Sequence, residues 1–135
     1  PAGSNMSTLQ ERLDKDFKEL PECIRNSGNG QRCLTLIATL CDMLPEQYDP
    51  SDTTAAVLFD HDELSISLLV HCTKQKRQVS FEVRDGGGAL RIIRLDESMR
   101  RLCYECDPSE DGLIKETVAW LTCGAGGSSF APAVE

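Results

Sequence analysis

Between Thr53 and Leu95, apolar and polar residues alternate in a pattern that predicts four consecutive β-strands. Strict alternation places one set of side chains on a buried face and the other set on a mostly exposed face. We therefore expect an antiparallel sheet with one apolar and one mostly polar side. The alternation is clearest at Leu64, Ile66, Leu68, Val70 and Cys72, and again at Val79, Phe81 and Val83.

The loops between these segments predict how the strands pair. Residues 86 and 87 are consecutive glycines, which suit the two-residue turn of a tight hairpin. We expect the two earlier loops to close over residues 60–63 and 74–77. All three loops then bring the apolar residues to one side, and His71 lies beside Ser80 on the other. The expected pairs are Val83 with Leu90, Phe81 with Ile92, Glu82 with Arg91, Val70 with Phe81, and Val57 with Ile66.

Helical spacing predicts helices before and after this sheet. The first spans residues 7–20, and the second runs from about Cys33 to Leu44, after a turn at residues 27–30 and before an acidic loop at residues 46–52. After the sheet, Asp96 is expected to cap a short helix that ends at Tyr104. A last helix starts at residues 107–110 and closes at Gly124. The fold class is therefore α+β: a four-stranded antiparallel meander with helices packed on one face, in two layers.

With 135 residues, the chain is expected to form a single domain over residues 7–123. We interpret residues 1–6 as an expression scar and residues 124–135 as a flexible tail. The order helix, helix, meander, helix, helix resembles that of RWD-type domains, which implies a role in protein assembly. The Tyr-Pro turn that usually follows their sheet is missing from this sequence.

Cysteine usage and hydropathy bear on the compartment. The seven cysteines are odd in number, and no apolar leader precedes Met6. We therefore expect a reducing compartment, cytoplasmic or nuclear. No apolar run approaches the roughly 18 residues that a membrane-spanning helix needs, so no membrane association is expected.

Charge is unevenly distributed along the chain. The net charge is −8, yet eight basic residues and only four acidic ones lie between His71 and Arg101. We call these eight residues the basic strip. The overall negative charge argues against general nucleic-acid binding. The members of the basic strip are Lys74, Lys76, Arg77, Arg84, Arg91, Arg94, Arg100 and Arg101.

Catalytic and metal-binding motifs are weak. His61 lies in a predicted turn, and His71 lacks an orienting carboxylate in any recognisable motif. Cys103 and Cys106 form a C-x-x-C motif without a second ligand pair, so packing is the favoured interpretation. A phosphate loop would need a helix after the glycines of residues 86–88, where a strand is expected. We assign no catalytic, cofactor or metal residue.

These observations favour a non-enzymatic protein-protein interaction domain, either an adaptor or an assembly subunit of an intracellular complex. We expect it to dock an acidic or helical, amphipathic partner segment on the polar side of the sheet. The sequence is compatible with both a homo-oligomer and a hetero-oligomer. One alternative is a thiol redox or zinc-dependent protein that uses Cys103 and Cys106; a second is weak nucleic-acid binding by the basic strip. The expected partner-binding residues are Leu69, His71, Lys76, Arg77, Arg84, Arg91 and Ile93.

Overall fold

The computed structural model describes residues 9–43, 53–84, 90–107 and 111–123. Three helices precede the sheet: α1 (Leu9–Lys18), the single turn α2 (Glu22–Arg25) and α3 (Gly28–Met43). Five strands follow: β1 (Thr53–Asp60), β2 (Ser65–Cys72), β3 (Arg77–Val83), β4 (Leu90–Leu95) and β5 (Arg101–Cys106). Helix α4 (Asp111–Cys123) ends the described fold.

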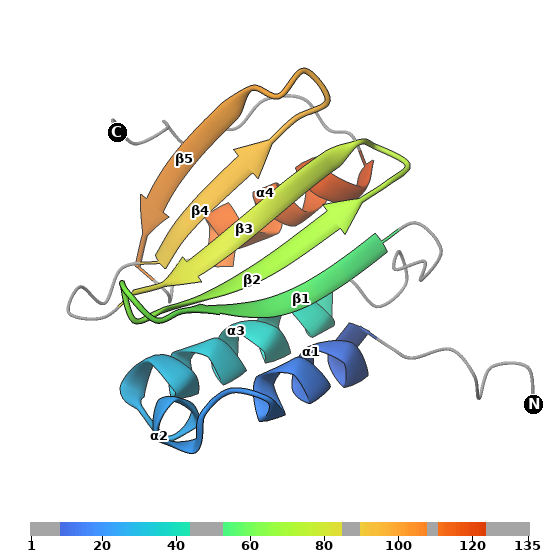
Figure 1. The fold of residues 1–135 in the computed structure, drawn as a ribbon. Helices are drawn as coiled ribbons and strands as arrows, with labels where there is room; N and C mark the ends of the chain where they lie inside the picture. Colours follow the sequence, from blue (N-terminus) through green and yellow to red (C-terminus); the bar gives the residue numbers. More distant parts are fainter. Residues whose placement is uncertain (1–8, 44–52, 85–89, 108–110, 124–135) are drawn as a thin grey trace, which may run out of the picture.

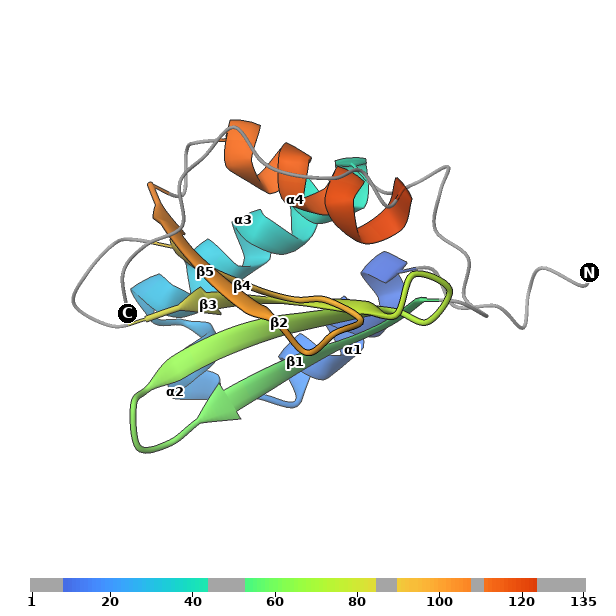
Figure 2. The same cartoon turned by 90° about the horizontal axis from the view of Figure 1, so that it is seen from above.

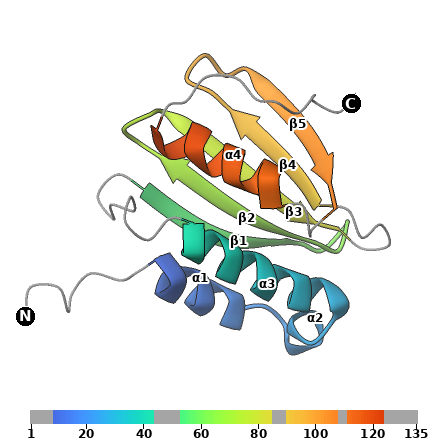
Figure 3. The same cartoon turned by 180° about the vertical axis from the view of Figure 1, so that it is seen from behind.

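The strands form one antiparallel sheet in the order β1-β2-β3-β4-β5 (Figure 1). The helices α1, α3 and α4 lie on one face of this sheet (Figures 2 and 3). The predicted α+β class and two-layer arrangement are confirmed, with five strands in place of four. The expected helix 96–104 was wrong, because residues 101–106 form β5. The element order therefore departs from the RWD-type order, since a fifth strand stands where the first of two helices was expected.

A tight turn at Asp96 is the reason why β5 can form. The carboxylate Oδ1 of Asp96 accepts hydrogen bonds from the backbone N–H groups of Ser98 and Arg100, both at 2.9 Å. Met99 adopts a positive φ of 64°, and the backbone N–H of Asp96 donates to the Arg100 carbonyl. Asp96 therefore caps a hairpin turn, which uses the same side-chain chemistry as a helix cap.

The two faces of the sheet carry the residues predicted for them, but the register of the first two hairpins differs from the prediction. Phe81 lies opposite Ile92 and Glu82 opposite Arg91, as expected. In the first two hairpins every pair is displaced by two residues, because the loops occupy 61–64 and 73–76. Leu64 is therefore an exposed turn residue with a φ of 52°. The observed pairs in these hairpins include Val57 with Leu68, Leu68 with Phe81, and Val70 with Val79.

The core lies between the sheet and the helices. Phe81 and Ile92, whose burial the predicted faces required, are 1% and 0% exposed. Helix α4 buries the apolar side that the sequence predicts for it, including Leu113, Thr117 and Leu121. Removing these side chains from water is the main favourable term in folding such a domain.

Two local features at α1 and α3 were not predicted from the sequence. Residues 28–30 begin α3 and do not form a free joint, because the Ser27 hydroxyl accepts the backbone N–H of Gly30 at 3.2 Å. Helix α1 also covers the free edge of β1. Its Asp16 carboxylate accepts the backbone N–H of Val57 at 3.1 Å, which blocks pairing with another strand. Predictions for residues 1–6, 46–52, 86–87, 108–110 and 124–135 lie outside the described residues.

Candidate partner-binding face of the sheet

The sheet face opposite the helices is covered by no helix or strand of the described chain (Figure 1). We call it the open face. Its side chains form rows across the strands, because residues paired in register point to the same side. The middle row combines apolar and small residues, most of them half-buried. Its members are Ala56, Leu69, Ser80, Ile93 and Cys103.

A charged row runs beside this apolar row. Glu82 and Arg91 are paired in register, with 4.0 Å between Oε1 and Nε. The predicted cross-strand charge pair is therefore confirmed. Arg91 Nε also lies 3.1 Å from the sulfur of Cys103. Because Arg91 is already engaged on the sheet, it contributes less unpaired charge than the sequence suggests.

On the other side of the middle row, His71 lies opposite Gln78. The sequence placed it opposite Ser80, which was wrong by the two-residue displacement described above. Ser80 instead pairs with Leu69. The contact between a serine and a histidine that the sequence allowed is therefore not formed by direct cross-strand pairing.

Arg94 belongs to the basic strip in sequence but not in space. It is 2% exposed and lies under α4, where its Nε and Nη2 donate to the Thr117 hydroxyl at 3.2 and 2.8 Å. Its guanidinium carbon is 4.5 Å from the centre of the Tyr104 ring. Burial lowers the pKa of Arg94, while Tyr104 and Glu116 partly offset that effect. Arg94 is therefore part of the core.

Arg77 also turns toward the helices. Its Nη1 donates to the Trp120 carbonyl at 2.8 Å, and its guanidinium lies 4.7 Å from the centre of the Trp120 ring. Its Nε pairs with Glu97 at 3.3 Å. The structure therefore does not bring Arg77 together with the other expected partner-binding residues. The sequence could have predicted this position, because residues two apart on a strand share a face, and Arg77 is two residues before the buried Val79.

Four other cations of the basic strip lie in or next to two turns at one end of the sheet: Lys74, Lys76, Arg100 and Arg101. The turns at residues 73–76 and 96–100 lie at the same end (Figure 1), and the Arg77–Glu97 ion pair links them. The side chains of Lys74, Lys76 and Arg100 are exposed and have no hydrogen bond or ion pair with any described residue. Met99 stands among them with 73% of its surface exposed. We call Lys74, Lys76, Met99, Arg100 and Arg101 the basic end.

Arg84, in contrast, lies at the opposite end of β3. Its Nη2 lies 3.6 Å from the Glu63 carboxylate, and the two side chains are 42% and 59% exposed. Of the seven expected residues, Leu69, His71, Arg91 and Ile93 thus share the open face, Lys76 lies at its basic end, and Arg84 and Arg77 lie apart. The sequence missed Met99, whose exposure follows from a turn that the sequence read as a helix.

The two cysteines of the C-x-x-C motif point to opposite faces of β5. Cys103 pairs with Ile93 in the middle row of the open face, whereas Cys106 pairs with Leu90 and belongs to the core. Residues three apart on a strand are separated by about 10 Å, beyond the Cα separation that a disulfide allows. No group of three or more potential metal ligands occurs among the described residues. This geometry does not support a redox or zinc site built on the pair.

Comparison of the chain with protein-family models, curated proteins and solved structures finds no match. Within the described residues, no helix has the length and apolar character required to cross a bilayer.

Proposed function

We propose that this chain is a non-enzymatic protein-protein interaction domain, an adaptor or assembly subunit, that binds an acidic, amphipathic segment of a partner. The observation that carries the proposal is the position of the basic end. Three exposed cations without described partners lie at one end of the sheet face that no described element covers, and the row of His71 separates them from the apolar middle row.

The two parts of this surface have different roles. Leu69 and Ile93 are half-buried and offer apolar area that a partner side chain can cover, which supplies affinity. Lys74, Lys76 and Arg100 attract carboxylates, which increases the association rate and selects among partners. Basic turns alone would also attract nucleic acid, but binding of single strands usually needs exposed aromatic side chains on which bases stack. Phe81 is the one Phe, Tyr or Trp between His71 and Arg101, and it is buried in the core.

The geometry constrains the partner. Two residues along a strand span about 7 Å, and the turns begin soon after the row of His71, so the apolar and acidic groups of the partner must be roughly 10–15 Å apart. About two turns of helix cover the same distance. An amphipathic helix with apolar residues in its middle and carboxylates at one end meets this requirement.

Selection from a library of short random peptides for binding to the domain, by phage display, tests the proposal without knowledge of the natural partner. Enriched sequences should combine apolar residues with Asp or Glu at that spacing. The affinity of an enriched peptide is then measured with three proteins: the unchanged domain, K74E/K76E/R100E, and the control K15E/R32E/K115E. The control makes the same change in net charge at exposed positions of α1, α3 and α4.

We expect the triple variant at the basic end to weaken binding by at least about tenfold and the control to change it by less than about twofold. Replacing Leu69 and Ile93 with Ser should also weaken binding. The proposal fails if acidic peptides are not enriched or if both triple variants bind alike. It also fails if a single-stranded oligonucleotide binds as tightly as the peptide.

A further inference from the structure

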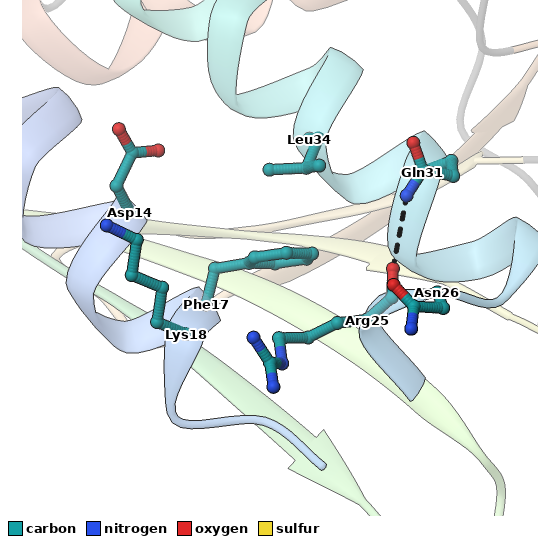
Figure 4. Close-up of a pocket in the computed structure, with 7 residues that line it drawn as sticks. All are labelled: Asp14, Phe17, Lys18, Arg25, Asn26, Gln31 and Leu34. Atoms are coloured by element: carbon teal, nitrogen blue, oxygen red, sulfur yellow. Dashed lines mark hydrogen bonds between the residues drawn. The ribbon is translucent and has the colours of Figure 1, made fainter. Parts of the chain in front are cut away.

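A second candidate site lies on the opposite side of the molecule, where α1, α2 and α3 meet. A hollow of about 400 Å³ opens between these helices (Figure 4). It is independent of the open face, because no strand residue lines it. The residues on which the argument depends are Asp14, Phe17, Lys18, Arg25, Gln31 and Leu34.

Among the side chains that line the hollow, positive charges outnumber negative ones. Lys18 and Arg25 carry two positive charges against the single negative charge of Asp14. The Lys18 side chain has no hydrogen bond or ion pair with any residue that the structure describes. Arg25 uses only its Nε, which donates to the Leu20 carbonyl at 3.0 Å. Its two Nη groups are left for a ligand, and a guanidinium binds a carboxylate through two parallel hydrogen bonds.

Apolar surface lies between these charges. The Phe17 ring extends between Lys18 and Gln31, with Leu34 on the far side of the ring from Arg25 (Figure 4). Leu34 is among the few large apolar side chains of the described residues that are exposed, at 36%. Phe17 is 7% exposed and forms the floor of the hollow, so a ligand body placed over it would cover mainly the exposed side chain of Leu34 while its charged group meets the cations.

The wall formed by α2 and α3 is held in place by local contacts. Gln31 donates its side-chain amide to the Arg25 carbonyl at 3.2 Å (Figure 4). A side chain at Gly30 would collide with the carbonyl oxygens of Ile24 and Arg25, so only glycine allows this close approach. Arg25 is therefore anchored on both its backbone and its Nε before any ligand arrives, which reduces the entropic cost of binding.

We propose that this hollow binds a small organic monocarboxylate with an apolar or aromatic body. The carboxylate pairs with Arg25 and Lys18, and the body rests on Phe17 and Leu34. Asp14 limits the negative charge that the hollow accepts, which favours a monoanion over a phosphate or dicarboxylate.

Naphthoate is a suitable probe, and naphthylmethanol is its neutral counterpart of similar shape. Titration of each into the full chain is followed by the amide shifts of an NMR correlation spectrum. Naphthoate should move the amides of Phe17, Asn26, Gln31 and Leu34 and bind at least about fivefold more tightly than the alcohol. K18Q and R25Q should each weaken naphthoate binding by a similar factor, whereas K15Q should not.

Since R25Q also removes the contact with Leu20, K18Q keeps the test decisive if R25Q fails to fold. The proposal is overturned if K18Q binds naphthoate as the unchanged protein does, or if the alcohol binds equally well. It is also overturned if the shifted amides lie on the open face. None of these results depends on peptide binding by the basic end.

Discussion

Arg91 and Arg94 lie three residues apart on β4, and their surroundings differ completely. Arg91 is on the open face, where it is partly exposed and pairs with Glu82 at 4.0 Å. Arg94 is on the helix-covered face, 2% exposed, with Thr117 as its hydrogen-bonding partner and Tyr104 and Trp120 beside its guanidinium. Residues with the same side chain in the same strand therefore serve the surface in one case and the core in the other.

The comparison shows that parity along a strand decides what a charge can do. Cations on the covered face stabilise contacts between the sheet and α4, and they are out of reach of a partner. Cations at the turns keep their charge exposed. Of the basic strip defined by sequence, only the part at the basic end retains three cations without described partners.

The largest difference between the faces is expected for Phe81 and Leu58. Phe81→Ala should lower the free energy of unfolding by about 3–5 kcal/mol, because it leaves a cavity among side chains that cannot fill it. Leu58 is 50% exposed on the open face, and Leu58→Ala should change stability by less than about 0.5 kcal/mol. Urea unfolding measures both values. Similar losses would mean that the open face is covered in solution.

The two arginines of β4 provide the next test. Arg94→Ala should cost about 2–4 kcal/mol, because packing against Tyr104 and the bonds to Thr117 are both lost. Arg91→Ala should cost less than about 1 kcal/mol, since its ion pair is partly solvated.

Arg94→Met is the matched control for the charge of Arg94. It keeps an apolar side chain of similar length and should lose less stability than Arg94→Ala. Equal losses for the alanine variants of Arg91 and Arg94 would contradict the assignment of the two faces.

The pH dependence of unfolding tests the burial of Cys33, which lies on the buried side of α3. Burial raises the pKa of its thiol from 9.0 to about 12. The unfolded thiol therefore ionises first as pH rises, and stability is full below about pH 9 and falls toward about pH 12. Between pH 9 and 11 the contribution of Cys33 is a loss of roughly 2 kcal/mol.

The control for this effect is Cys33→Ala, which should show a shallower decline over the same pH range. Denaturant unfolding at a series of pH values provides the comparison. An identical pH dependence in the two proteins would show that Cys33 is accessible to water.

The smallest effect is the ion pair between Glu82 and Arg91. A double-mutant cycle with Glu82→Gln and Arg91→Gln should give a coupling of about 0.2–1 kcal/mol, reduced by added salt. A coupling of zero at low salt would show that the two side chains do not interact in solution, and would contradict the charged row of the open face.

Much of this fold was predictable from alternation alone. Period two assigned the faces correctly, because a slip of two residues leaves every side chain on its original side. The register of the first two hairpins was not predictable, because their turns end in Leu64 and Lys76 with positive φ, positions where glycine or asparagine would have been the signal. The first turn is also stabilised by Asp60, whose carboxylate accepts the backbone N–H of Asp62 at 2.8 Å.

The candidate site was predictable only in part. Leu69, Ile93 and Arg91 follow from parity, and the same parity would have removed Arg77 and Arg94 from the basic strip. The exposure of Met99 was missed, because Asp96 suits both a helix cap and a hairpin turn. The alternation of Leu102, Tyr104 and Cys106 is the signal that favours the strand.

The most direct test of the central claim is the NMR mapping of a selected acidic peptide on the full chain. The account predicts that the largest amide shifts occur at Leu69, Ser80 and Ile93 and in the turns 73–76 and 96–100. Shifts confined to α1, α3 and α4, with the open face unchanged, would contradict it.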